Sequence, residues 1–407
     1  MITKKLALKL FEGFSIERWN DMVRPFDLIE MDKAAEKMVI AYIIGKFEEQ
    51  KGGVIDWDWM IYASLFELFR KIALCDIKSP VQRMIRHKYP DEYIKLNEWV
   101  IDQYKPIIED EELFEMFGNY IRQVAQPNRP MTLTDRVIRA AHKFSAMREF
   151  EMIALVNEPF RLKGIEKDLN EDIQPYLDLQ GLQLFITKQR PYEFLMVLEK
   201  LRFQTRWNQT PRIPKTSVLG HSFFVAILTL LLGRQDGFTM CPKRRYNNFF
   251  SGLFHDLPEA VTRDIISPVK QATDGLPSIV KEIEDEIVKQ DLCPLMESFY
   301  VDELMYFTSD EFENRILLDS GTGKMPITHI DFEDMNTKYN SAAFSPIDGK
   351  LVRCADHISA FLEAHSSINH GITSKHLLDG KNNLLKTYKN KGFINGFSVS
   401  DFFAQFS

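Results

Sequence analysis

The chain has 407 residues, of which 45% are hydrophobic and 12% aromatic, so it can bury a sizeable core in two or three domains. Its 51 basic and 58 acidic residues give a net charge of −7, which argues against the basic surface that binding to a nucleic-acid backbone requires. The four cysteines lie far apart in the sequence, which is typical neither of a disulfide framework nor of a thiolate zinc site, and we expect a cytoplasmic protein.

The apolar residues recur mainly at helical spacing. This spacing predicts amphipathic helices over residues 6–14 and 34–42, whereas the alternation typical of strands is scarce, so we predict an all-α fold. The longest apolar run, residues 223–232, is about half the roughly 20 residues that cross a bilayer, so it predicts a buried core helix and no membrane partner. The first residues lack the apolar region of a signal peptide, and we expect no secretion.

The two halves of the sequence repeat each other at an offset of 188 residues. Arg18-Trp19 recurs as Arg206-Trp207, and the segment 76–81 recurs as 264–269. A further block, residues 139–146, resembles residues 353–360 at an offset of 214, which places the additional residues of the second copy between positions 274 and 349. We interpret the chain as a tandem duplication of two helical bundles, with domains at 1–190 and 191–407.

The second copy contains a set of candidate metal ligands in three separate segments. They are His221, the adjacent pair His255 and Asp256, and Asp356. Mixed imidazole and carboxylate ligands suit a divalent ion such as Mn, Fe, Co or Zn, with coordination positions left for water and a phosphate oxygen.

This set, together with Arg206-Trp207 and the segment 255–259 (His-Asp-Leu-Pro-Glu), resembles the HD-domain metal-dependent phosphohydrolases. More narrowly, it resembles their bacterial 5'-deoxynucleotidase branch over roughly residues 195–370. The resemblance implies an all-α fold, one divalent ion (Mn, Co, Fe, Zn or Mg) held by the four ligands, and hydrolysis of a nucleoside 5'-monophosphate. Ile266 and His357 depart from that branch, in which proline and lysine are usual at these positions. A second metal would need further histidines between the adjacent pair and the last aspartate, where only His329 lies.

The remaining site residues are assigned by chemistry and by the same resemblance. Glu259 and the ligand Asp256 are the predicted catalytic residues, because Glu259 would share a helical face with His255 and could act as general acid and base. Arg206 offers a planar fork for the 5'-phosphate, with a surface ion pair as the alternative.

Three further residues are substrate contacts by resemblance. Trp207 would pack against the sugar and crowd a 2'-hydroxyl, Asp264 would accept from the 3'-hydroxyl, and Lys270 would contact the phosphate. The structural alternatives are core packing for Trp207, a turn cap for Asp264 and a solvated side chain for Lys270.

The first copy has lost the metal ligands and the acid/base. Their positions hold Lys33, Glu67, Leu68, His142 and Lys71. We therefore predict a catalytically dead copy, in which the retained Arg18, Trp19 and Asp76 serve either a surviving nucleotide site or the fold alone. We also predict that Lys33 and Glu67 form an ion pair across the old metal cavity, with His142 bonded to Glu67.

The functional prediction is a phosphohydrolase whose partner is a small nucleotide. The alternatives are a hydrolase of nucleoside triphosphates or other phosphate esters, and a nucleotide-responsive regulatory or scaffold protein that senses through its first copy. We expect the two halves to pack about a pseudo-twofold axis as an intramolecular pseudo-dimer, because a duplicated chain can bury the surface that a single copy would use to dimerise.

Overall fold

The computed structural model describes residues 2–126, 129–235, 238–263, 273–319 and 325–406, and most of them are helical. The helices of the N-terminal half are α1 (Lys4–Phe11), η1 (Glu12–Ser15), α2 (Glu30–Gln50), α3 (Trp57–Leu74), α4 (Ser79–Lys88), α5 (Pro90–Tyr104), α6 (Glu111–Ala125), α7 (Leu133–Ala154), α8 (Pro159–Ile173), η2 (Gln174–Tyr176) and α9 (Gln180–Ile186). Those of the C-terminal half are α10 (Arg190–Leu198), α11 (Lys200–Phe203), α12 (Val218–Leu232), α13 (Pro242–Phe254), α14 (Glu259–Thr262), α16 (Leu276–Ile287), η3 (Val288–Leu292), η4 (Cys293–Leu295), α17 (Val301–Thr308), α18 (Phe332–Thr337), η5 (Ala342–Phe344), α19 (Gly349–Asn369), α20 (Lys375–Lys389) and α21 (Val399–Ala404).

The helices predicted from apolar spacing are confirmed. The segment 6–14 lies in α1 and η1, the segment 34–42 lies in α2, and the apolar run 223–232 ends α12, in which every residue is buried. Some helix starts carry a side chain that caps a free backbone N–H group, as in the reciprocal bonds between Thr132 and Asp135 at the start of α7.

Two small sheets make the all-α prediction wrong in detail. Strands β1 (Asn314–Leu317), β2 (Ile327–His329) and β3 (Ile347–Asp348) form an antiparallel sheet in the order β2-β1-β3, and β4 (Phe393–Ile394) pairs with β5 (Phe397–Ser398). The first sheet lies between positions 274 and 349, the segment in which the sequence comparison predicts additional residues. These strands have two to four residues, too few to show an alternating pattern in the sequence.

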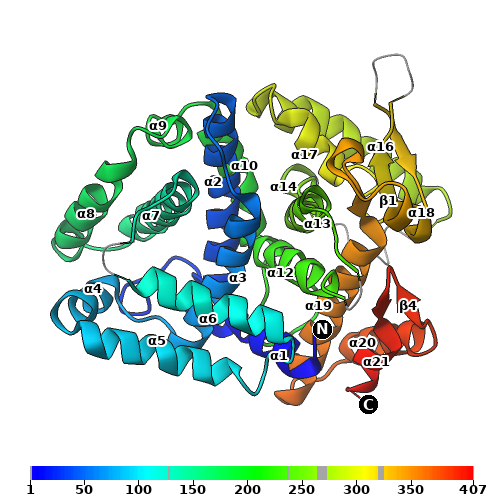
Figure 1. Ribbon diagram of the computed structural model, residues 1–407, viewed down its shortest axis with the longest axis horizontal. Coiled ribbons are helices and arrows are strands. Elements are labelled where there is room, and N and C mark those ends of the chain that lie inside the picture. The colour runs from blue at the N-terminus through cyan, green and yellow to red at the C-terminus, as the bar shows by residue number, and fades with distance from the viewer. Residues whose placement is uncertain (1, 127–128, 236–237, 264–272, 320–324, 407) are drawn as a thin grey trace.

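The two halves pack against each other through α2 and α12 at the centre of the molecule. In Figure 1 the helices of the N-terminal half, blue to teal, lie on the left, and those of the C-terminal half, green to red, lie on the right. Gly220 permits a close approach, because a Cβ atom there would lie 2.7 Å from Asp32 Oδ1. The Phe14 and Phe224 rings pack edge to face with centroids 5.6 Å apart.

Polar groups also join the halves across this interface. The carboxylate of Glu303 accepts hydrogen bonds from the hydroxyls of Tyr42 (2.8 Å) and Tyr246 (2.7 Å). It also pairs with Lys46 and Lys243, each at 2.7 Å. Burial alone would raise the pKa of Glu303, but the two lysines outweigh it and lower the pKa to about 2.

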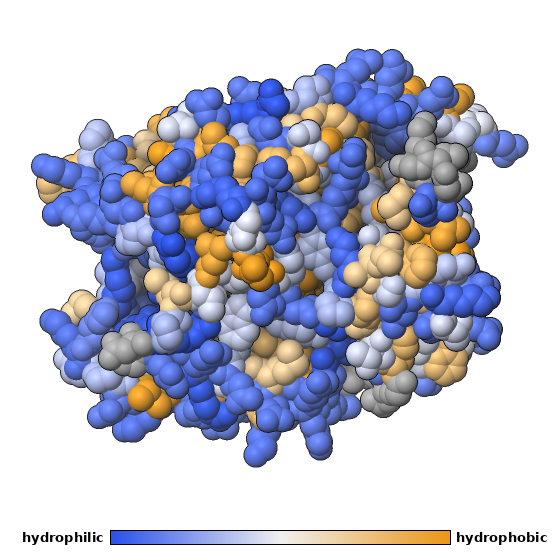
Figure 2. Space-filling model, turned by 45° about the horizontal axis from the view of Figure 1, so that its top comes forward, coloured by the Kyte–Doolittle hydropathy of each residue, from blue (hydrophilic) through white to orange (hydrophobic). Residues whose placement is uncertain are grey.

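The surface gives no sign of a membrane-crossing element. In the part of the chain that the structure describes, every helix is too short or too polar to span a bilayer. The face in Figure 2 is mostly hydrophilic, with apolar side chains in small groups.

Candidate metal centre

His221 reaches the centre from the buried helix α12. Ser217 caps this helix by accepting from the Gly220 N–H at 2.8 Å, and His221 is fully buried one turn into it. Nδ1 of the ring lies 2.9 Å from Ser359 Oγ, which holds the ring orientation. Within the described part of the chain, Nε2 makes no hydrogen bond, although Asp356 Oδ1 lies 3.1 Å away, so this buried nitrogen is available to a metal.

His255 directly follows the last residue of α13 and presents its Nε2 atom to the same point. Its Nδ1 lies 2.8 Å from the carbonyl oxygen of Gly252, which can only accept, so the proton must sit on Nδ1. In the neutral imidazole Nε2 is then the nitrogen that carries a lone pair, which a metal ion can bind. The rings of His221 and His255 are 5.3 Å apart.

Two carboxylates complete the set of four predicted ligands. Asp356 lies on α19. One of its carboxylate oxygens and a ring nitrogen from each of the two histidines lie within 4.8 Å of one another, close enough to bind the same metal ion. Asp256 Oδ2 lies 3.3 Å from His255 Nε2 and 3.7 Å from His221 Nε2, and this buried oxygen accepts no hydrogen bond from the residues that the structure describes. Unsatisfied buried atoms of both ligand types, aimed at one point, fit a divalent cation.

The charge around Asp356 favours a metal-binding carboxylate. Burial alone would raise the pKa of Asp356, but His221 and the guanidinium of Arg206 outweigh it and hold the pKa well below its usual range. The group is therefore ionised at neutral pH, which metal ligation requires.

Arg206 faces the centre from the turn that precedes α12. Its two terminal nitrogens lie 3.8 Å from Asp256 Oδ2 and 3.7 Å from Asp356 Oδ1, and its Nε lies 3.3 Å from Glu363 Oε1. The planar fork thus points at the ligand carboxylates, where it could hold an anion bound to the metal.

Glu363 is a residue of this site that the sequence prediction missed. This buried carboxylate accepts a hydrogen bond from Trp207 Nε1 at 2.7 Å and another from the hydroxyl of Thr216, and it pairs with Arg206. It lies seven residues after Asp356, on the same face of α19. That spacing, and the glutamate at the equivalent position 149, were the signals that could have identified it.

Trp207 is held in an unusual backbone conformation. Its φ of 54° lies in the left-handed region, which a bulky residue rarely adopts, and its ring packs where Gly380 of α20 leaves room. The indole N–H donates to Glu363, so Trp207 and Arg206 share this carboxylate as a partner.

Glu259 lies close to the centre, although the helical argument for it was incomplete. Helix α13 ends at Phe254 and α14 begins at Glu259, so a turn, not one continuous helix, connects it to His255. Burial alone would lower the pKa of Arg206, but carboxylates outweigh it and raise the pKa, Glu363 most strongly and the half-buried Glu259 least of the four that contribute. Asp264 and Lys270 lie outside the described residues.

The corresponding place in the N-terminal half differs from the prediction. Glu67 accepts hydrogen bonds from Lys37 and from the Tyr120 hydroxyl at 3.1 Å, whereas Lys33 Nζ lies 3.6 Å from Glu149 Oε2. The predicted pairing of Lys33 with Glu67 is therefore wrong, as is the bond from His142 to Glu67. Lys37, one turn further along α2, reaches Glu67 first, and Lys33 turns toward a buried glutamate that the prediction did not consider.

Comparison with known proteins assigns the C-terminal half. Residues 198–384 match the family model described as HD domain, a segment that contains all four predicted ligands, Arg206 and Glu363. A search of curated proteins finds no match to the chain. This half therefore contains an HD domain of the phosphohydrolase type, with a possible metal site at His221, His255 and Asp356.

Proposed function

We propose that the HD domain hydrolyses (deoxy)nucleoside 5'-monophosphates to nucleoside and phosphate with one bound divalent ion. The observation that carries this proposal is the arrangement of Arg206, whose fork faces Asp256 and Asp356 at 3.8 and 3.7 Å. A metal-bound anion of phosphate size would therefore meet a bidentate donor on its outer side.

The division of roles follows from the side chains. When bound, a divalent ion polarises a phosphoryl oxygen and makes water more acidic. His221, His255, Asp256 and Asp356 would hold it. Glu363 orients Arg206, which would bind and position the phosphate.

The proton transfers and the substrate contacts are proposed for the remaining residues. Glu259 would move protons to and from the reacting oxygens, since its carboxylate interacts electrostatically with the Arg206 guanidinium. Trp207 would wall the sugar, with Asp264 and Lys270 as further substrate contacts.

We also propose that the chain is a duplication, with a degenerate copy at 1–190 and the active copy at 191–407. Support comes from contacts that recur at the sequence offsets. Trp19 has a φ of 55°, as Trp207 has 54°, and its Nε1 donates to Glu149 Oε2 at 2.9 Å, as Trp207 donates to Glu363. The Arg18 N–H donates to the Leu28 carbonyl as the Arg206 N–H donates to the Thr216 carbonyl.

The proposed pseudo-dimer has support from reciprocal contacts between the halves. Trp57 packs on Tyr246, and Asp58 pairs with Arg245. At the offset of 188, position 57 is equivalent to 245 and position 58 to 246, so the two contacts join the same two repeat positions in opposite directions. The approach of Asp32 to Gly220 joins a position to its own equivalent, as expected on a twofold axis.

The experiment is a phosphate-release screen of the metal-loaded protein over nucleoside mono-, di- and triphosphates and simple phosphate esters. The proposal expects release from 5'-monophosphates, with deoxynucleotides preferred. Phosphate release only from triphosphates or unrelated esters would show that the substrate assignment is wrong. The absence of phosphate release with every metal tried would contradict the enzymatic proposal.

A further inference from the structure

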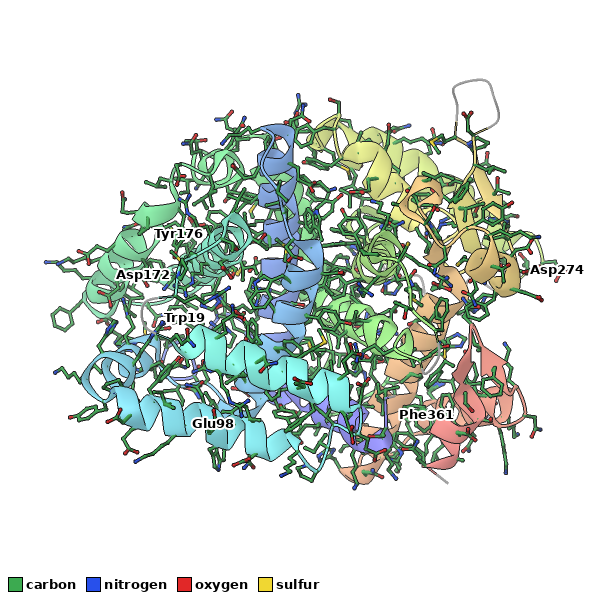
Figure 3. All side chains as sticks on the ribbon, in the orientation of Figure 1. Trp19, Glu98, Asp172, Tyr176, Asp274 and Phe361 are labelled. Atoms are coloured by element: carbon green, nitrogen blue, oxygen red, sulfur yellow. The ribbon has the colours of Figure 1, made fainter. Side chains whose placement is uncertain are left out.

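A cavity of about 310 Å³ lies in the N-terminal half, between helices α2, α3, α4 and α7. Nine lysine or arginine side chains line it, against three carboxylates. The whole chain has a net charge of −7, so this concentration of positive charge is opposite to the average of the molecule. In Figure 3, Tyr176 of its wall lies beside α7 and α8 with Asp172.

Several of these cations lack counter-ions. Within the described residues, the side chains of Lys71 and Arg139 have neither an ion pair nor a hydrogen bond, and both are only partly exposed. Arg70 bonds only to the neutral Asn97 and Tyr93, and Arg86 bonds only to a backbone carbonyl. The lining carboxylates Glu30 and Glu67 offset part of this positive charge, but the nine cations outnumber the three carboxylates, and the excess of like charge costs folding stability.

The innermost cation is the most deeply buried. Lys33, which is 2% exposed, belongs to the cavity wall, and its buried Nζ atom makes no hydrogen bond to any part of the protein that the structure describes. Its nearest carboxylate oxygen, on Glu149, is 3.6 Å away and already accepts from Arg18 and Trp19. Lys33 therefore adds positive charge to the wall of the cavity, and the described residues leave its N–H donors without a hydrogen-bond partner.

His142 reports the same positive field. Burial and the surrounding lysines, Lys33 and Lys37 first among them, lower the pKa of His142 well below its usual range. The neutral imidazole beside these ammonium groups can accept or donate a hydrogen bond without adding charge.

The walls of the cavity also include aromatic rings. Trp59, Tyr93, Tyr120 and Tyr176 line it, so an aromatic or sugar moiety could pack beside a charged group. The volume admits a small molecule and excludes a duplex or a folded protein segment.

We propose that this cavity binds a small phosphate-bearing anion, either a nucleotide or free phosphate, without a metal ion. Lys33, Lys71 and Arg139 supply the positive charge that a cation would otherwise provide, and they come from three different helices, α2, α3 and α7. The proposal goes beyond the activity of the HD domain and does not depend on it, because every residue that carries it lies outside residues 198–384.

The test measures binding by calorimetry in excess EDTA, which removes metal-dependent binding at the HD domain. The probes are inorganic phosphate, AMP, dAMP and ATP. The variants are Lys71→Gln and Arg139→Gln, with Lys5→Gln as the matched control, since Lys5 is exposed on α1 and does not line the cavity. Each cavity variant should weaken binding about tenfold or more, because each removes a charge-assisted hydrogen bond, whereas the control should leave it unchanged.

The probes distinguish the two sources of the anion. Tighter binding of AMP or dAMP than of phosphate identifies a nucleotide site, and equal binding identifies a phosphate site; either result supports the proposal. It is overturned if no probe binds, or if both cavity variants bind every probe as the control does.

A second measurement separates a binding role from a structural one. Without ligand, Lys71→Gln and Arg139→Gln should raise the thermal midpoint relative to the control, because they relieve repulsion, and added ligand should stabilise the wild type more than these variants. A lower midpoint for both variants without ligand would assign the cations to the fold and contradict the proposal.

Discussion

Replacing Glu363 by glutamine should damage both stability and catalysis, whereas the same change at Glu149 should damage stability alone. Glu363 is 1% exposed, lies 3.3 Å from Arg206 Nε and accepts from Trp207 at 2.7 Å. Removing one partner of a buried ion pair lowers the free energy of unfolding by about 3–5 kcal/mol. Glutamine keeps the shape of the side chain and one acceptor oxygen, so Glu363→Gln should lower it by about 3 kcal/mol.

The catalytic part of this prediction follows from the orientation of Arg206. Without the anionic anchor on its Nε side, the guanidinium is no longer held in the orientation that faces Asp256 and Asp356, which is its proposed phosphate-binding position. A displacement of about 1 Å in a positioning group can cost on the order of 10²-fold, so kcat/KM for phosphate release should fall by roughly that factor.

The pH dependence gives a further check. Burial alone would raise the pKa of Glu363, but Arg206 and Arg212 outweigh it and lower the pKa to about 2. In the unfolded chain the pKa of a glutamate is about 4.3. The stabilisation by the Glu363 ion pairs is therefore complete above that pH and is lost as the pH falls toward 2. The stability difference between wild type and Glu363→Gln should therefore shrink over that interval.

Urea unfolding measures the stability, and steady-state phosphate release measures kcat/KM. Glu149 is the matched control, because it holds Trp19 and Arg18 at 2.9 and 3.0 Å in the half without metal ligands. Glu149→Gln should lose a similar free energy of unfolding and keep its activity. Equal losses of kcat/KM in the two variants, or none in Glu363→Gln, would refute this account of Arg206.

The other predictions concern catalysis and the interface between the halves. Arg206→Ala should raise KM for a 5'-monophosphate, and Glu259→Gln should lower kcat with the metal still bound; an unchanged kcat for Glu259→Gln would remove it from the mechanism. Burial raises the pKa of Asp32 to about 6, so ionisation of this carboxyl destabilises the folded protein. The destabilisation is absent below about pH 3.9 and complete above pH 6. Asp32→Asn should therefore raise the free energy of unfolding at pH 8 by about 3 kcal/mol and by much less at pH 4, and a loss at pH 8 would contradict this. Glu303→Gln should destabilise the interface at pH 7, with a difference that disappears as the pH falls from about 4.3 toward 2, and a pH-independent difference would exclude the ion pairs as its cause.

Three of the four predicted ligands, His221, His255 and Asp356, lie close enough together in the structure to hold a metal ion, and the assignment of Asp256 stays a prediction. His221 alone carries no distinctive signal in the sequence, whereas His255 and Asp256 form a distinctive adjacent pair. Pattern and chemistry agree at these positions. The resemblance that joined them to Asp356 covers the same part of the chain as the HD domain match.

The parts that were missed depend on three-dimensional reach. Glu363 reads as an ordinary helical glutamate until the fold places it under Arg206. Glu67 pairs with Lys37 and not with Lys33, which lies one helical turn earlier on α2. Lys33 instead lies beside the buried Glu149, which another helix contributes. Long flexible side chains can reach several partners, and the sequence does not rank them.

The most direct test of the central claim is metal content measured together with phosphate release. The account predicts close to one divalent ion per chain in the active protein. Asp256→Ala should lose both the metal and the activity, because it removes a buried ligand oxygen that makes no hydrogen bond within the described residues. Lys5→Gln should retain both. A metal-free Asp256→Ala protein that released phosphate at the wild-type rate would contradict the metal mechanism.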